Sequence, residues 1–200
     1  MALTSSPYGV NIIGDQSGPD PRPQRIPNGI ANQFGSNIFA GQPVKINPAT
    51  GTLIPVTAAT DAIYGIFQGV DFTPLGSRPT ISPFWPAGTN YDPNYEMSVY
   101  IFPMWISSIR LQVQADGPIN QVALGSQFNF TVANLGNGSL ATGISYCTIA
   151  ATPVPAGQFG QLNLVEFFPG VGSTIGDAFT DGIYTIANPQ IGASRFASVG

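Results

Sequence analysis

The clearest hydrophobic pattern in the chain lies in residues 109–117, which read IRLQVQADG. Ile109, Leu111, Val113 and Ala115 point to one side of an extended chain, and the polar residues between them point to the other. Alternation with a period of two is typical of a half-buried antiparallel strand. An Asp-Gly turn signal follows the last apolar residue, so we predict that the strand ends there.

Several other segments carry a strand signal, and turn-forming residues separate them. Residues 42–56 read as two short strands around the turn 47–51, which predicts a hairpin. In the strand predicted over 62–72, Gly65 and Gly69 lie on one face and leave room for close packing or a bulge. The remaining strand candidates are 95–106, broken at Pro103, 127–138, with a hairpin turn at Asn137-Gly138, 144–154, 161–168 and 181–190.

Helical patterns are short and weak in this sequence. The best candidates are residues 29–34 and 118–123, and neither sustains a 3.6-residue period. Short strands without crossover helices predict an all-β fold. We expect an antiparallel β-sandwich or a small, jelly-roll-like β-barrel, formed by a single β-rich domain over residues 37–200.

Residues 1–36 differ from the rest, because prolines at positions 19, 21, 23 and 27 lie among Gly, Asp, Arg and Gln. Proline fixes φ, lacks an N–H donor and favours extended neighbours. We therefore expect an extended N-terminal arm without a core of its own. Either it is a disordered tail in the free protein, or it orders along a neighbouring subunit. In the second case Arg22, Arg25 and Pro27 are candidate partner-binding residues.

Composition adds a prediction about the surface. Charged residues make up 8% of the chain and hydrophobic residues 43%, against roughly 25% charged in an average soluble domain. The net charge is −4, and the six basic residues are scattered, so nothing favours nucleic-acid binding. A weakly charged surface repels other proteins poorly, which favours a protein that works in an assembly. The alternative is a protein from a compartment where high charge is not needed.

The residues needed for catalysis are scarce. The chain has no histidine and one cysteine, Cys147, which excludes Ser-His-Asp and Cys-His catalysis and histidine-containing metal sites. Most carboxylates sit in turn-like contexts. Glu166 is better explained by solvent exposure or an ion pair with arginine than by catalysis, and an enzyme that uses only carboxylates is the least favoured class. We predict no catalytic, cofactor-binding or metal-binding residue, no cofactor and no small-molecule substrate.

The sequence also carries no targeting signal that we can identify. Its first residues, MALTSSPYGVNIIG, lack a basic region and an apolar region, unlike a secretory signal. No apolar run approaches the ~20 residues of a membrane span. We expect synthesis in a cytoplasm and no membrane partner.

Four stretches together resemble a known family. They read FAGQPVKINPATGTLIPVTAATDAIYGIFQGV (39–70), GVDFTPLGSRPTISPFWPAGTNY (69–91), VQADG (113–117) and GDAFTDGIYTIANPQ (176–190). Their order and spacing resemble the head decoration, or cement, proteins of tailed bacteriophages over roughly residues 36–190. The sequence departs from that family before the strand at 109, where an acidic motif is missing although Pro103 is kept.

The resemblance implies a structural virion protein made in the host bacterial cytoplasm. Such a protein binds the major capsid protein on the capsid exterior and stabilises the head lattice, as a homotrimer at three-fold and quasi-three-fold positions. Aromatic residues are enriched at interfaces, so Phe84, Trp85 and Tyr91 join the candidate partner-binding residues, with core packing as the alternative for one of the first two. The alternative functions are another virion component (tail, fibre or baseplate) or a carbohydrate-binding β module.

Overall fold

The computed structural model describes residues 7–16, 18, 20–106, 108–168 and 174–190, and within them the chain is all-β, as predicted. The strands are β1 (Asn11–Asp15), β2 (Gln24–Pro27), β3 (Ile38–Phe39), β4 (Pro43–Ile46), β5 (Leu53–Pro55), β6 (Gly65–Phe72), β7 (Thr80–Ser82), β8 (Phe84–Trp85), β9 (Ser98–Pro103), β10 (Ile109–Gln114), β11 (Gln127–Phe128), β12 (Leu162–Phe167) and β13 (Asp181–Ile186). Two 3₁₀-helices, η1 (Gln121–Ala123) and η2 (Val132–Asn134), complete the named elements.

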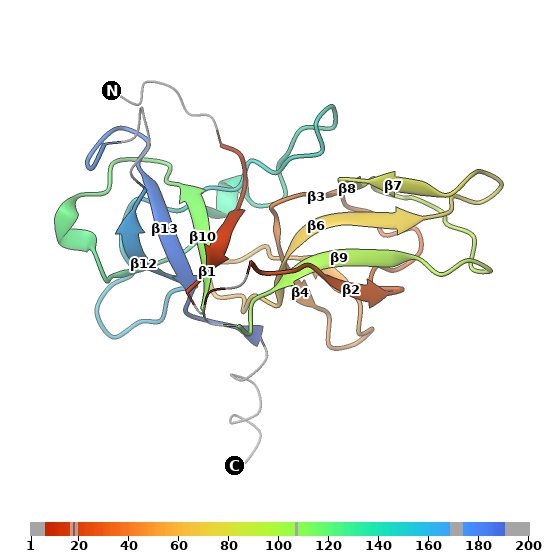
Figure 1. Cartoon of the computed structure of the whole chain (residues 1–200), viewed down its shortest axis with the longest axis horizontal. Helices are drawn as coiled ribbons and strands as arrows, with labels where there is room; N and C mark the ends of the chain where they lie inside the picture. Colours follow the sequence, from red (N-terminus) through yellow and green to blue (C-terminus); the bar gives the residue numbers. More distant parts are fainter. Residues whose placement is uncertain (1–6, 17, 19, 107, 169–173, 191–200) are drawn as a thin grey trace, which may run out of the picture.

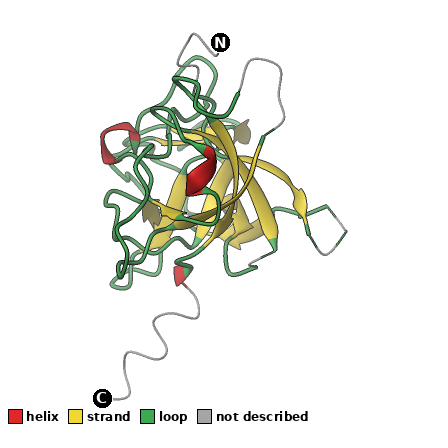
Figure 2. Ribbon diagram, turned by 90° about the vertical axis from the view of Figure 1, so that its left-hand side faces the viewer, coloured by secondary structure: helices red, strands yellow, loops and turns green. Residues whose placement is uncertain are grey.

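The strands form two main sheets. Sheet A has the order β1-β10-β13-β12-β11, and sheet B has the order β2-β9-β6-β4-β5, with β7 also paired to β6. A small third sheet joins β3 to β8. All pairs of named strands are antiparallel, and the sheets remain open in a sandwich-like arrangement. Figure 1 shows the two sheets side by side, and Figure 2 shows the loops around them.

Local chemistry explains the best-predicted elements. The β4–β5 hairpin closes where the Asn47 carbonyl accepts the Gly51 N–H at 2.8 Å, and Gly51 adopts φ 71°, a conformation that favours glycine. In β6 the register shifts between Phe67 and Gly69. This shift is the bulge predicted from the glycine spacing, and it leaves Gln68 as the extra residue.

Two hydrophobic clusters fill the molecule. We call the cluster that lies mainly under sheet A core A, and the cluster that lies under sheet B core B. Ile66 of β6 and Met104, just after β9, belong to core A, so sheet B continues into the neighbouring core. The chain passes from sheet B to sheet A between β9 and β10, which follow one another in sequence.

The described strands within residues 1–36 lie along the edges of the two sheets. β1 pairs with β10 at one edge of sheet A, and β2 pairs with β9 at one edge of sheet B. Val10 is buried in core A and Ile30 in core B. The prolines fit this arrangement, because edge strands tolerate residues without an N–H donor, and the few apolar residues between them supply core contacts.

The second half of the chain departs furthest from the predicted strands. Residues 144–154 make isolated bridges rather than a named strand, and 127–138 contains only β11 followed by η2. The helical candidate 29–34 forms turns, and 118–123 contains only the short η1. The alternating pattern correctly identified these segments as apolar and extended. They pair with several neighbouring segments through isolated bridges instead of forming one continuous strand ladder.

Candidate interaction surfaces

The structure places the six predicted partner-binding residues in two groups. Three lie in or beside the edge strand β2, and three lie in β8 or the loop after it. No hydrogen bond, ion pair or ring contact between described residues joins the two groups. The first group is Arg22, Arg25 and Pro27; the second is Phe84, Trp85 and Tyr91.

Trp85 is part of core B and is 0% exposed. Its ring lies 5.4 Å from that of Phe72 and 6.2 Å from that of Tyr91, measured between centroids. A side chain enclosed in this way cannot contact another protein without unfolding its surroundings. The prediction of a partner contact is therefore wrong for Trp85, and the alternative of core packing is confirmed.

Phe84 and Tyr91 are half-buried and hold the segment 82–91 in place. The Phe84 ring stacks on Phe39 with centroids 5.8 Å apart. The Tyr91 N–H donates to the side-chain oxygen of Asn32 at 3.0 Å, and Tyr91 forms a bridge with Pro74. Phe84 therefore connects this segment to β3, and Tyr91 connects it to neighbouring loops, so neither presents a free aromatic surface.

The β2 group is exposed, in contrast. Arg25 donates to the Ser98 hydroxyl at 2.8 Å and forms an ion pair with Glu96. Pro27 is exposed at the end of β2, and Arg22 is exposed just before it. A paired arginine is less available to an acidic partner than a free one, so of the two arginines Arg22 is the better candidate for such a contact.

Sequence reasoning missed the most exposed apolar side chains near these residues. Ile81 in β7 is 82% exposed, Leu75 is 60% exposed and Tyr95 is 58% exposed. Arg78 is also exposed, in the turn between Leu75 and Ile81. We call these four residues the tip surface. Their segments form the end of sheet B farthest from sheet A (Figure 1). Single exposed hydrophobic residues are normal, but a group at one end of a molecule favours an interaction site.

Backbone hydrogen bonds fix the loops that carry the tip surface. The Leu75 N–H donates to the Asn90 carbonyl at 2.9 Å, and the Asp92 N–H donates to the Thr73 carbonyl at 2.8 Å. The β6–β7 turn closes where the Ser77 N–H donates to the Pro74 carbonyl at 2.9 Å. Two loops distant in sequence are thereby held together, so the tip surface is largely formed before any partner binds.

The surroundings of Glu166, Cys147 and Lys45 give each of these side chains a structural role. Glu166 forms an ion pair with Arg110, which is one of the two explanations predicted for it. Cys147 is fully buried, and burial raises the pKa of its thiol to about 12, so it remains a protonated thiol at neutral pH. Lys45 forms an ion pair with Asp61, in which Lys45 Nζ lies 2.7 Å from Asp61 Oδ1. Burial tends to raise the pKa of Asp61, but hydrogen bonds from Lys45 and from two backbone N–H groups lower it overall.

The described residues contain no group of three or more His, Cys, Asp or Glu side chains that could hold a metal ion. Among the same residues, no helix is long and apolar enough to cross a membrane.

A scan against protein-family models, a search of curated proteins and a search of solved structures each found no match for this chain.

Proposed function

We propose that the chain is a structural, non-enzymatic protein of a tailed-bacteriophage head that binds the capsid exterior and stabilises the head lattice. The observation that carries the proposal is the tip surface, where Leu75, Ile81 and Tyr95 each expose more than half of their accessible area. The resemblance of residues 36–190 to head decoration proteins supplies the finer details. These are a homotrimer, the major capsid protein as partner, and a position outside the capsid after synthesis in the host cytoplasm.

The chemistry of the tip surface suits a protein partner. Fully burying a large aliphatic or aromatic side chain contributes roughly 1.5–3 kcal/mol, and a few such anchors dominate most protein interfaces. Arg78 adds a planar cation that can bind a carboxylate with two hydrogen bonds. The chain is otherwise poor in charge, so apolar contact at a few residues is the main attraction available. We expect the partner surface to be apolar with at least one acidic residue.

Co-sedimentation with phage heads that lack this protein tests the proposal. The wild-type chain should pellet with the heads, and Ile81→Thr should weaken binding about tenfold, since it replaces an apolar anchor by a polar residue that also favours strands. Val122→Thr is the matched control, because Val122 is 94% exposed but lies in η1 beside sheet A.

The outcomes separate the two parts of the proposal. Failure of the wild-type chain to bind heads would refute the capsid function. Binding that Ile81→Thr and Leu75→Ser leave unchanged would refute the role of the tip surface alone. The trimer is tested by the native mass of the protein after its release from heads. This mass should equal three times 20.9 kDa, about 63 kDa.

A further inference from the structure

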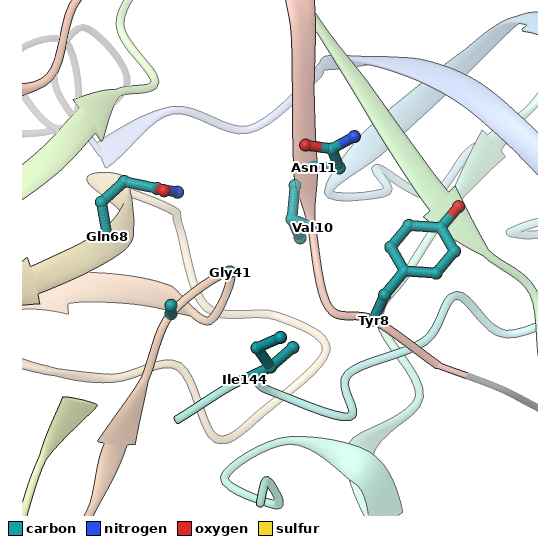
Figure 3. A pocket seen from close by; sticks show the side chains of 7 residues that line it. Tyr8, Val10, Asn11, Gly41, Gln68 and Ile144 are labelled. Carbon is teal, nitrogen blue, oxygen red and sulfur yellow. The ribbon is translucent and has the colours of Figure 1, made fainter. Parts of the chain in front are cut away.

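A groove with a volume of about 370 Å³ lies where sheets A and B meet. Three of its lining residues lie at the start of β1, two lie just before β4, and two come from β6 and a later loop. They are Tyr8, Val10, Asn11, Ala40, Gly41, Gln68 and Ile144. Figure 3 shows the Gln68 side chain extending toward the start of β1. The volume falls at the small end of the roughly 300–1,000 Å³ typical of small-molecule sites.

The backbone around the groove is already paired within the chain. The Val10 N–H donates to the Gly41 carbonyl at 2.9 Å, and the Gly41 N–H donates to the Phe67 carbonyl at 2.8 Å. Ala40 uses both of its backbone groups, one with Gly143 and one with Ser145. Residues 40 and 41 therefore offer no free strand edge to which an extended peptide could add. Side chains supply the remaining recognition groups of the groove.

Two carboxamides supply the polar side chains of the groove. Gln68 is the extra residue of the β6 bulge, and bulges commonly redirect a side chain toward a site. Its amide makes no hydrogen bond to any other described side chain or backbone group. The Asn11 amide makes a single long bond, from its nitrogen to the Gln112 side-chain oxygen at 3.5 Å. Both amides therefore keep a carbonyl acceptor available, and Gln68 also keeps its donors.

The apolar part of the groove includes an aromatic ring held by its far end. The Tyr8 hydroxyl donates to the Asp181 carboxylate at 3.2 Å. Burial, together with the charge of Asp181, raises the pKa of Tyr8 well above its usual range. The Tyr8 hydroxyl therefore stays protonated and continues to donate its hydrogen bond. Val10 and Ile144 extend the apolar lining. None of the lining residues is charged, and a charged ligand would lose hydration without gaining an ion pair.

We propose that this groove binds a neutral saccharide of one or two sugar rings. Sugar hydroxyls both donate and accept hydrogen bonds, as carboxamides do, and the apolar face of a sugar ring can pack on Tyr8 and Ile144. Trp85 is buried, so it takes no part in this site. The proposal does not depend on capsid binding.

Saturation-transfer NMR on the full chain, with glucose, galactose, maltose and lactose as probes, tests the site. At least one probe should bind with a Kd near 1 mM. Gln68→Leu removes the amide and should weaken that binding roughly threefold to tenfold, the range for one neutral hydrogen bond. Tyr8→Leu, which removes the ring, should weaken it as much. Gln158→Leu is the control, since Gln158 is exposed in a loop outside the groove, and urea unfolding checks that each variant folds.

Three results would overturn the proposal. The first is the absence of binding for all four sugars at about 10 mM, tenfold above the expected Kd. The second is sugar binding that both Gln68→Leu and Tyr8→Leu leave unchanged, which places the site elsewhere. The third is a set of chemical-shift changes around Gln68 with an octaproline peptide and none with sugars, which identifies a peptide groove. Capsid sedimentation is a separate measurement, so either proposal can fail alone.

Discussion

Replacing Trp85 by Ala should lower the free energy of unfolding by about 3–5 kcal/mol, the usual range for truncating a buried Trp or Phe. Trp85 has no exposed area and lies against Phe72 and Tyr91, so the change leaves a cavity that surrounding residues fill only in part. For a chain of this length about 1 kcal/mol shifts Tm by roughly 2–4 °C. The melting temperature should therefore fall by about 6–20 °C.

Urea unfolding followed by far-UV circular dichroism measures this change without relying on tryptophan fluorescence. Trp105→Ala is the matched control, because Trp105 is half-buried and its ring packs at a tilt against Tyr64, with the ring centroids 4.9 Å apart. It should cost clearly less stability than Trp85→Ala. A Trp85→Ala protein that unfolds like the wild type but changes its native mass would refute the reasoning, since it would place Trp85 at a subunit contact.

Three further predictions concern Asp61, Cys147 and Tyr184. Asp61→Asn should cost roughly 1–3 kcal/mol near neutral pH, because the carboxylate loses its ion pair with Lys45. The folded pKa of Asp61 is lowered, so its contribution is complete above the unfolded pKa of about 3.9 and is lost as the pH falls through the folded pKa. Urea unfolding in a pH series should therefore show the difference from wild type shrinking in acid. Cys147 should resist iodoacetamide in the folded chain and react after unfolding, since its thiol is buried; equal rates before and after, read by mass spectrometry, would contradict this. Tyr184→Phe should keep or slightly raise the melting temperature, because the buried hydroxyl has no hydrogen-bond partner; a fall of several degrees would reveal a missing partner.

The sequence predicted strands well where apolar residues alternate within one sheet. The strand at 109–117 appears as β10, with Ile109, Leu111 and Val113 buried. The prediction that its polar side faces solvent failed for two residues, because Gln112 and Gln114 are 9% and 7% exposed. β10 lies between β1 and β13, and the Asn11 side chain reaches Gln112. The alternation of apolar and polar residues shows which face of a strand packs on the core. It does not show whether other parts of the chain cover the opposite face.

The candidate sites were harder to predict than the fold. Aromatic residues in SPFWPAGTNY suit both an interface and a core, and only the three-dimensional packing of Trp85 decides between them. The sequence did not identify Ile81 as an exposed interaction residue, because the strand around it is only three residues long. So short a segment shows no alternation of apolar and polar residues from which an edge strand could be predicted. A search for apolar residues between two prolines, such as Pro79 and Pro83, could have found it, since prolines flanking a short strand are typical of a sheet edge.

The aromatic segment and the tip surface are nevertheless connected. Trp85 anchors the segment in core B, and Tyr91 packs against the Trp85 ring. Tyr91 in turn forms a bridge with Pro74, which precedes Leu75 at the tip. Because exposed anchors bind more tightly when they need no ordering on contact, a rigid link from the core to an exposed loop favours binding. The buried residues of this segment therefore serve a partner contact indirectly, by fixing the loop that carries the exposed ones.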